Sequence, residues 1–283
     1  MSGKLKVICE KPGLFASVQD QGRMGCQSMG VPIGGAMDRG AAAAANALVG
    51  NPVERPVLEM TLVGPVLRFE GSGSIALVGA DLSPQLNGKP MLMCERVTVA
   101  TGDVLHFGRC VSGCRAYLAI GGKWDVPVWM GSVSPMCEGE AVPGKLTKGS
   151  VLSIETVEGA EFCRKVAPEP WVPVLGVYEG PECHLLNVQQ KKAWTSVTHV
   201  VSSHSNRMGL RLKTKLILEE PMEVISSGVF PGVVQLTHSG QPIILGIDAQ
   251  TTGGYPRIAV VQSEDLDVLA QLKPGDTFRF VWL

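Results

Sequence analysis

The sequence predicts a mainly β protein of two domains with few short helices. Apolar residues, chiefly Val, Leu and Ile, come in short runs that glycine or proline separates. Glycine is frequent, at 34 residues, whereas aromatic residues make up 5%. This composition is typical of a turn-rich chain. The length of 283 residues exceeds that of a usual single domain, so two domains are expected.

The first half of the chain is predicted to form strands around one helix. Residues 5–10 alternate between apolar and polar, as a strand does. Asp38 is a candidate N-cap for a helix over 39–49, and Gly50-Asn51-Pro52 is a typical end signal. Asn87-Gly88 predicts a tight hairpin. Further strands are expected at 56–62, 66–69, 74–78, 96–100 and 104–107.

A change in composition predicts the domain boundary. Residues 157–174 are rich in charge and proline, which is typical of a linker, so we place the boundary near residue 165. The expected domains are 1–165 and 166–283. In the second domain we expect helices within 182–194 and 265–272 and strands at 174–178, 198–202, 217–219, 233–236 and 243–247.

Two short patterns recur and suggest that the halves are related. The turn-plus-strand segment 102–107 resembles segments 149–154 and 275–280. Gly22-Arg23-Met24-Gly25 is similarly repeated as Asn206-Arg207-Met208-Gly209. Two similar β domains would account for both repeats, although matches this short also arise by chance.

Charge and hydropathy exclude several classes of partner. The net charge is −1 and the basic residues are scattered, which argues against a nucleic-acid partner. No apolar run approaches the ~18 residues of a membrane span, and no signal peptide is recognisable, so we expect a soluble cytoplasmic protein. The cysteines form no CxxC pair, so reduced thiols and no metal site are expected.

Three glycine-rich stretches combine an arginine with carboxylates or amides: 18–51, 202–212 and 246–257. Arg23 and Arg207 are candidate anion anchors, because a guanidinium offers two parallel donors to a carboxylate or phosphate. Gly253-Gly254 is a candidate nest of backbone amides. We expect the loops near residues 20, 207 and 250 to contribute to one polar site.

Several catalytic signatures are missing from the sequence. It has no P-loop, no dinucleotide fingerprint, no HExxH and no Gly-x-Ser-x-Gly elbow. It also has no Met-Lys dipeptide of the kind that accepts biotin, so no biotin is expected on this chain. A nucleophile triad or a metallohydrolase centre would have to be assembled from scattered residues.

Six motifs, in this order, resemble the biotin-dependent carboxyltransferase-like family: VQDQGRMG, GVPIGGAMDRGAAAAANALVGN, LEMTLVGP, SNRMGLRL, DAQTTGGYP and AQLKPGDTFRF. The family includes the C subunit of bacterial 5-oxoprolinase, the carboxyltransferase module of urea carboxylase and an antagonist of a sporulation kinase inhibitor. The resemblance implies two cyclophilin-like β-barrel domains. It runs from about residue 8 to the C-terminus.

For the oxoprolinase members, the resemblance implies a multi-subunit enzyme that uses ATP to open the lactam 5-oxoproline to glutamate. The B and A subunits of 5-oxoprolinase are the implied partners, and a small amide or lactam is the substrate. ATP is then a cosubstrate, bound by a partner subunit or at an unfamiliar site in this chain. Lactams and urea share an unreactive amide, so oriented donors at the carbonyl oxygen would stabilise developing charge. We expect an activated lactam oxygen, then attack by water.

These considerations give two sets of candidate site residues. The catalytic candidates are Asp20, Arg23, Asp38, Glu59, Arg207 and Asp248. The substrate-binding candidates are Gln19, Asn206, Gln250, Thr251, Thr252, Gly253, Gly254 and Tyr255. The sequence departs from the family pattern at Asn206, where Asp is usual, at Ala249, where Arg is frequent, and at Pro135, where a Ser-Thr-Asp ending is usual.

Three functions therefore remain open. The first is a 5-oxoprolinase subunit that is inactive without its partners. The second is carboxyl transfer from carboxybiotin to urea or a similar amide. The third is a regulatory module that binds a kinase inhibitor without turnover.

Overall fold

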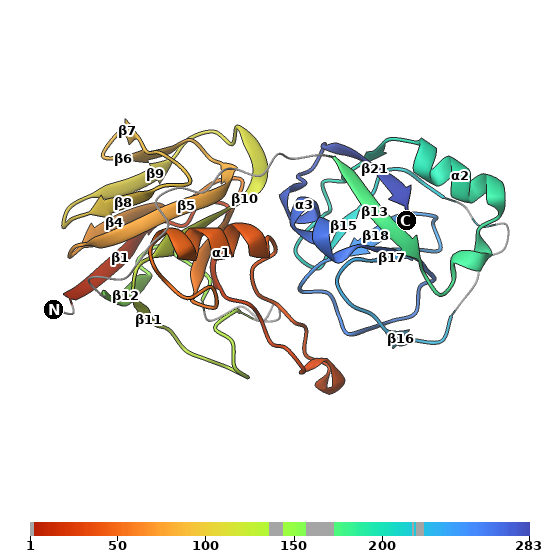
Figure 1. Cartoon of the computed structure of the whole chain (residues 1–283), viewed down its shortest axis with the longest axis horizontal. Coiled ribbons are helices and arrows are strands. Elements are labelled where there is room, and N and C mark those ends of the chain that lie inside the picture. Colours follow the sequence, from red (N-terminus) through yellow and green to blue (C-terminus); the bar gives the residue numbers. More distant parts are fainter. Residues whose placement is uncertain (1–2, 136–143, 157–172, 217, 219–223) are drawn as a thin grey trace. The chain divides into compact units, whose positions relative to one another are not determined.

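The computed structural model describes residues 3–135, 144–156, 173–216, 218 and 224–283 (Figure 1). The chain divides into two compact units. Unit 1 comprises Met1–Arg23 and Gly34–Glu169, and unit 2 comprises Met24–Ile33 and Pro170–Leu283. Strands dominate the described residues and the sheets are curled into half-barrels, which confirms the predicted mainly β fold. The predicted boundary at residue 165 lies outside the described residues.

Unit 1 contains an antiparallel sheet of seven strands. Their order is β11 (Lys123–Asp125), β12 (Val151–Thr156), β1 (Gly3–Lys11), β4 (Val66–Glu70), β9 (Val104–Phe107), β6 (Pro84–Leu86) and β7 (Lys89–Pro90). Asn87 and Gly88 join β6 to β7 with φ values of 53° and 74°. Both residues are left-handed, as a type I′ turn requires, so the predicted hairpin is confirmed.

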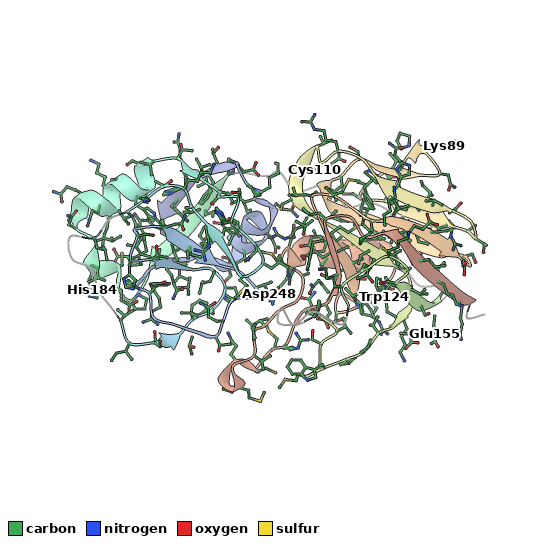
Figure 2. The ribbon with its side chains drawn as sticks, turned by 180° about the vertical axis from the view of Figure 1, so that it is seen from behind. Lys89, Cys110, Trp124, Glu155, His184 and Asp248 are labelled. Carbon is green, nitrogen blue, oxygen red and sulfur yellow. The ribbon has the colours of Figure 1, made fainter. Side chains whose placement is uncertain are left out.

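A second sheet of five antiparallel strands packs in the same unit. Its order is β2 (Phe15–Gln19), β3 (Val57–Thr61), β10 (Ser112–Ile120), β5 (Gly73–Asp81) and β8 (Arg96–Val99). One face of this sheet contributes Val18, Leu58 and Leu118 to the main apolar core. Trp124 of β11, labelled in Figure 2, belongs to the same core and is 5% exposed.

Helix α1 (Arg39–Leu48) covers part of the opposite face of the five-stranded sheet. The Asp38 side chain accepts a hydrogen bond from the Ala41 N–H at 2.7 Å, so the predicted cap is confirmed. Ala41, Ala42 and Ala45 are buried in one cluster with Tyr117. Because alanine has almost no side-chain bulk, this helix can lie close against the sheet.

Unit 2 is built on a seven-stranded sheet. Its order is β14 (His199–Val200), β21 (Thr277–Trp282), β13 (Val174–Glu179), β20 (Arg257–Val261), β17 (Val233–Leu236), β18 (Pro242–Leu245) and β15 (Gly209–Arg211). Strands β13 and β21 pair in parallel and the other neighbours are antiparallel. β16 (Ser227–Gly228) and β19 (Thr252–Gly253) form a separate pair. The strand predicted at 217–219 falls mainly outside the described residues.

Helix α2 (Val188–Ser196) begins later than the predicted segment 182–194. Asn187 and Gln190 form a capping box, which fixes the start of the helix, and the 3₁₀ turn η2 (Cys183–Leu185) precedes it. Trp194 of α2 stacks on Phe280 of β21 at 4.3 Å. The described residues also form the short helices η1 (Gln27–Met29), η3 (Ser263–Asp265) and α3 (Leu266–Gln271).

The repeated turn-plus-strand segments have the same local conformation. Gly102, Gly149 and Gly275 have φ values of 94°, 85° and 92°, and each lies two residues before a strand, β9, β12 or β21. A side chain would strain this backbone, so the turn favours glycine. The shared conformation supports the inference that the two halves are related.

Candidate functional site

The predicted site residues fall into one group in each unit. Unit 1 holds five of them: Gln19, Asp20, Arg23, Asp38 and Glu59. Unit 2 holds the rest: Asn206, Arg207, Asp248, Gln250, Thr251, Thr252, Gly253, Gly254 and Tyr255. The expectation that all three loops contribute to one site stays a prediction.

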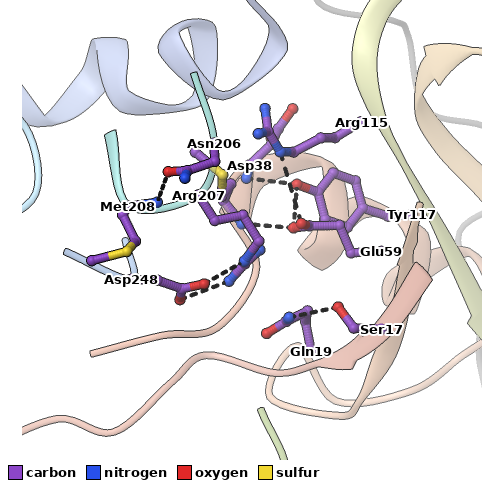
Figure 3. A network of polar contacts seen from close by, with 11 residues as sticks. Ser17, Gln19, Asp38, Glu59, Arg115, Tyr117, Asn206, Arg207, Met208 and Asp248 are labelled. Atoms are coloured by element: carbon purple, nitrogen blue, oxygen red, sulfur yellow. Dashed lines mark hydrogen bonds and ion pairs between the residues drawn. The ribbon is translucent and has the colours of Figure 1, made fainter. Parts of the chain in front are cut away.

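In unit 1, a row of polar side chains crosses the five-stranded sheet. Ser17 of β2 lies opposite Glu59 of β3, and Glu59 lies opposite Tyr117 of β10. Gln19 and Arg115 are each two residues along a strand from this row, so they share its face. The five side chains are 0–5% exposed. This polar row (Ser17, Gln19, Glu59, Arg115 and Tyr117) brings five buried polar side chains together on one face of the sheet (Figure 3).

Glu59 is at the centre of the polar row. Its Oε2 accepts hydrogen bonds from the Tyr117 hydroxyl and from the Met37 N–H, both at 2.9 Å. Arg115 Nε lies 3.8 Å from its Oε1. Burial, and then the nearby charges of Glu59 and Asp38, raise the pKa of Tyr117 well above its usual value. Tyr117 therefore remains a protonated phenol that donates to a fixed carboxylate.

Asp38 connects helix α1 to the polar row. Its backbone N–H donates to the Tyr117 hydroxyl oxygen at 2.8 Å, while its carboxylate caps the helix. The Tyr117 hydroxyl thus accepts from Asp38 and donates to Glu59. The start of α1 and the carboxylate of Glu59 are held in one hydrogen-bonded network, as Figure 3 shows.

Gln19 has an unusual environment for an amide side chain. Its Nε2 donates to Ser17 Oγ at 2.8 Å, but its Oε1 is buried and has no hydrogen-bond partner. The residue is 1% exposed. In Figure 3 the oxygen is turned away from Ser17. An unpaired buried carbonyl is unfavourable, so this oxygen is an unusual feature of the polar row.

Asp20 fastens two loops of unit 1 together. Its Oδ1 accepts from the hydroxyls of Ser132 and Ser134, at 2.5 and 2.7 Å, and from the Gly22 N–H at 2.9 Å. Its Oδ2 accepts from the Val133 N–H at 2.8 Å. Four donors surround this carboxylate, so Asp20 holds residues 132–134 against the loop that contains Gly22.

Arg23 also binds the 129–134 segment. Its Nη2 donates to the Ser134 carbonyl oxygen, and its guanidinium carbon lies 4.9 Å from the centre of the Trp129 ring. Such a cation–π contact, together with 3% exposure, fixes the guanidinium within unit 1. Pro135, where the sequence departs from the family pattern, directly follows this segment.

In unit 2, Arg207 and Asp248 form a buried bidentate ion pair. Arg207 Nε and Nη2 donate to Asp248 Oδ2 and Oδ1 at 2.6 and 3.0 Å, and the residues are 7% and 5% exposed. A Cβ at Gly246 would lie 2.2 Å from the Arg207 carbonyl oxygen. Glycine at 246 therefore permits the close approach of the two loops that carry this pair.

Asn206 shapes the turn that carries Arg207. Its Oδ1 accepts from the Met208 N–H at 2.9 Å, and its backbone pairs with Gly209. An asparagine oxygen can make this local bond just as an aspartate oxygen would. The departure from the family pattern at this position therefore keeps the turn.

The loop at 250–255 differs from the expected amide nest. Gly253 lies in β19, paired with β16, and neither Gly253 nor Gly254 has the positive φ that alternates in a nest of this type. The Gln235 amide packs directly on Gly253, since an added Cβ there would lie 2.5 Å from Gln235 Nε2. Tyr255 packs edge-on against His238 at 5.4 Å. A substrate-binding role for Gln250, Thr251, Thr252 and these residues stays a prediction.

A pocket of about 260 Å³ in unit 1 is lined by residues that include Val18, Asp125, Lys145 and Leu152. None of the predicted site residues lines it. Val18 points to the main core, whereas Ser17 and Gln19 point to the opposite face of β2. The pocket and the polar row therefore lie on different sides of that strand.

Five residues of these networks were missed by the sequence analysis: Ser17, Arg115, Tyr117, Ser132 and Ser134. A usable signal existed for two of them. Arg115 and Tyr117 stand two residues apart within an otherwise apolar segment, so both point to the same face of a strand. Ser132 and Ser134 carry no such signal, because their partner Asp20 is more than one hundred residues away.

The described residues contain neither a group of side chains placed to hold a metal ion nor a membrane-spanning helix. No three His, Cys, Asp or Glu side chains there are grouped to hold a metal ion. Six cysteines of that part are free thiols, and Cys137 and Cys163 lie outside it. None of its helices has the length and hydropathy needed to cross a bilayer.

Comparison with known proteins identifies the class. The family model for the carboxyltransferase domain, subdomain A and B, matches residues 29–282, and the chain belongs to this family. A relative within it is the C subunit of 5-oxoprolinase from Escherichia coli (strain K12). It is 38% identical over 282 residues, which cover 98% of this chain and 90% of the relative.

Solved structures have the same fold. The crystal structure of TTHA0988 matches with a TM-score of 0.88 and 30% identity, over 98% of this chain. This chain spans 55% of the TTHA0988 chain. The Kluyveromyces lactis urea carboxylase matches with a TM-score of 0.89 and 31% identity, over 98% of this chain and 27% of the enzyme.

Proposed function

We propose that this chain is the C subunit of an ATP-dependent 5-oxoprolinase, which opens 5-oxoproline to glutamate. One observation carries the proposal: the chain aligns over 98% of its own length with 90% of the Escherichia coli relative, whose name is that of the C subunit of 5-oxoprolinase. The partners in this proposal are the B and A subunits. ATP is the cosubstrate, and it binds to a partner or at a site of this chain without a familiar motif.

The polar row is the part of unit 1 that we assign to the amide. Opening a lactam moves charge onto the carbonyl oxygen, and preorganised polar groups lower the barrier when they are fixed before the reaction. Glu59 is fixed by Tyr117 and Met37, and Arg115 lies beside it. In this proposal Glu59 orients the substrate or accepts a proton, while Tyr117 and Asp38 hold Glu59 in place.

In unit 2 we assign an anion-binding role to Arg207. Its guanidinium is oriented by Asp248 through two parallel hydrogen bonds. A guanidinium held in this way is suited to a carboxylate, which 5-oxoproline carries, or to a phosphate. In unit 1, Asp20 and Arg23 have an indirect role in this proposal, because they fix the loops at 20–23 and 132–134.

The experiment is reconstitution of the chain with the A and B subunits. The complete set is expected to release glutamate from 5-oxoproline only when ATP is present, and the chain alone is expected to release none. Absence of ATP-dependent glutamate from the complete set, with all subunits folded, would refute the proposal.

One variant connects the activity to the polar row. Glu59→Gln keeps the shape of the side chain and removes its charge, and it is expected to lower kcat by at least about tenfold in the complete set. Glu155→Gln changes an exposed carboxylate of β12 in the same way and is expected to leave kcat unchanged. Equal activity of the two variants would remove Glu59 from the reaction.

A second candidate function is carboxyl transfer from carboxybiotin to urea or a similar amide. The match to Kluyveromyces lactis urea carboxylase favours it. Because no biotin is attached to this chain in either proposal, a separate biotin carrier would be needed. Transfer of labelled carboxyl from a carboxylated carrier to urea, catalysed by this chain, would establish this function in place of lactam opening.

A further inference from the structure

The buried carbonyl of Gln19 is a candidate recognition group to which the proposed function gives no role of its own. Its oxygen has no partner, although the residue is 1% exposed and its Nε2 is fixed on Ser17 at 2.8 Å. Buried polar atoms are nearly always paired, so an unpaired one calls for an explanation. Gln19 shares its sheet face with Glu59, the central carboxylate of the polar row.

We propose that the Gln19 side-chain carbonyl accepts a hydrogen bond from the N–H of the substrate amide, so that the site takes amides with at least one N–H and rejects N-alkylated ones. This inference rests on the proposed function, because it takes an amide to be the substrate. 5-Oxoproline and urea both carry the required N–H.

The chemistry of the group supports this assignment. A carbonyl oxygen only accepts hydrogen bonds, so its natural partner is an N–H or O–H donor. The bond to Ser17 fixes the amide plane, which leaves the oxygen pointing in a set direction before a ligand arrives. Because this oxygen is buried away from bulk solvent, its desolvation cost is already met when a ligand N–H binds. Binding therefore gains a hydrogen bond without a matching loss at the acceptor.

The same reasoning predicts discrimination against N-methyl amides. A methyl group in place of the N–H leaves the Gln19 oxygen unpaired and occupies the position of the hydrogen that this oxygen would accept. Sites that hydrogen-bond a substrate N–H reject analogues that lack it far better than apolar pockets reject a missing methylene.

The test compares two lactams that differ only at nitrogen, 2-pyrrolidone and 1-methyl-2-pyrrolidone. Binding to the full chain is measured by ligand-observed NMR titration, with no partner subunit and no turnover required. Wild type is expected to prefer 2-pyrrolidone by at least about tenfold. Gln19→Met keeps the length of the side chain without the carbonyl, and it is expected to reduce this preference to about twofold or less.

A matched control separates the site from general effects of the substitution. Gln85→Met makes the same change on β6, in the other sheet of unit 1, and is expected to keep the wild-type preference. Equal binding of the two lactams by wild type would overturn the inference, and so would an undiminished preference in a folded Gln19→Met chain. The wild-type comparison decides the question if that variant does not fold.

The two proposals fail in different ways. If the chain prefers the N–H lactam but the complete set releases no glutamate, the oxoprolinase proposal fails and Gln19 remains an amide-recognition residue. If glutamate is released but 1-methyl-2-pyrrolidone binds as well as 2-pyrrolidone, the role of Gln19 is refuted while the activity stands.

Discussion

Replacing Tyr117 with phenylalanine tests whether its hydroxyl holds the polar row together. The change removes one oxygen atom from a fully buried side chain and leaves the ring in place. Two hydrogen bonds disappear, from the Asp38 N–H at 2.8 Å and to Glu59 Oε2 at 2.9 Å. Glu59 keeps its bond from the Met37 N–H, whereas the Asp38 N–H loses the Tyr117 acceptor.

The expected loss of stability follows from these two bonds. A buried group left without its partner costs about 1–3 kcal/mol, and a hydrogen bond to a charged group contributes about 1.5–3 kcal/mol. Contributions within one network do not add fully, so we expect Tyr117→Phe to lower the free energy of unfolding of unit 1 by about 2–4 kcal/mol.

Native-state hydrogen exchange measures this loss separately in each unit. Amides of α1 and β3 are expected to exchange faster in the variant, because opening of unit 1 becomes easier, while amides of β13 and β21 are expected to keep their wild-type rates. Tyr178→Phe is the control, since Tyr178 is 53% exposed on β13. A change below about 0.5 kcal/mol for Tyr117→Phe, similar to that of an ordinary surface substitution, would refute the reasoning.

Two further predictions concern unit 2. Asp248→Asn removes the negative charge that binds the buried Arg207 guanidinium and is expected to destabilise unit 2 by about 3–5 kcal/mol in denaturant unfolding, whereas the exposed Asp125→Asn is expected to have almost no effect. Burial lowers the pKa of His199, although its hydrogen bond to the Trp194 carbonyl opposes the shift. Below about pH 6.5 the unfolded chain therefore takes up a proton at His199 more readily than the folded chain, so the contribution of His199 to stability is fully present above that pH and is lost as the pH falls below it. Thermal unfolding at pH 7.5 and 5.5 is expected to show a smaller decrease for His199→Gln than for wild type, and equal decreases would contradict the assignment.

Local signals predicted much of the fold because local interactions determine those features. Asp38 caps α1 as expected, and Asn87-Gly88 adopts the left-handed backbone that its turn requires. Helix α2 begins later than expected, because the capping box at Asn187 determines its start more strongly than the general amphipathic pattern does. Such elements depend on residues within one turn of each other, and a single sequence contains that information.

The candidate site was harder to predict because it depends on strand pairing. Ser17, Glu59 and Tyr117 become neighbours only through the register of β2, β3 and β10, which no local pattern specifies. Arg115 and Tyr117 alternate with apolar residues in β10, which places both on one face, but this alternation does not specify which strands pair with β10 or in which register. The pairing of Arg207 with Asp248 likewise joins two loops that are 41 residues apart.

The assignment of residues 24–33 to unit 2 has a practical consequence for genetic dissection. The polypeptide leaves unit 1 after Arg23, contributes ten residues to unit 2, and resumes unit 1 at Gly34. A division of the chain between the two units near its middle would therefore deprive the C-terminal fragment of residues 24–33. Two co-expressed fragments would form both units only if residues 24–33 of the N-terminal fragment joined the C-terminal fragment. Failure of such fragments to fold would therefore be no evidence against an origin of the chain from two related halves.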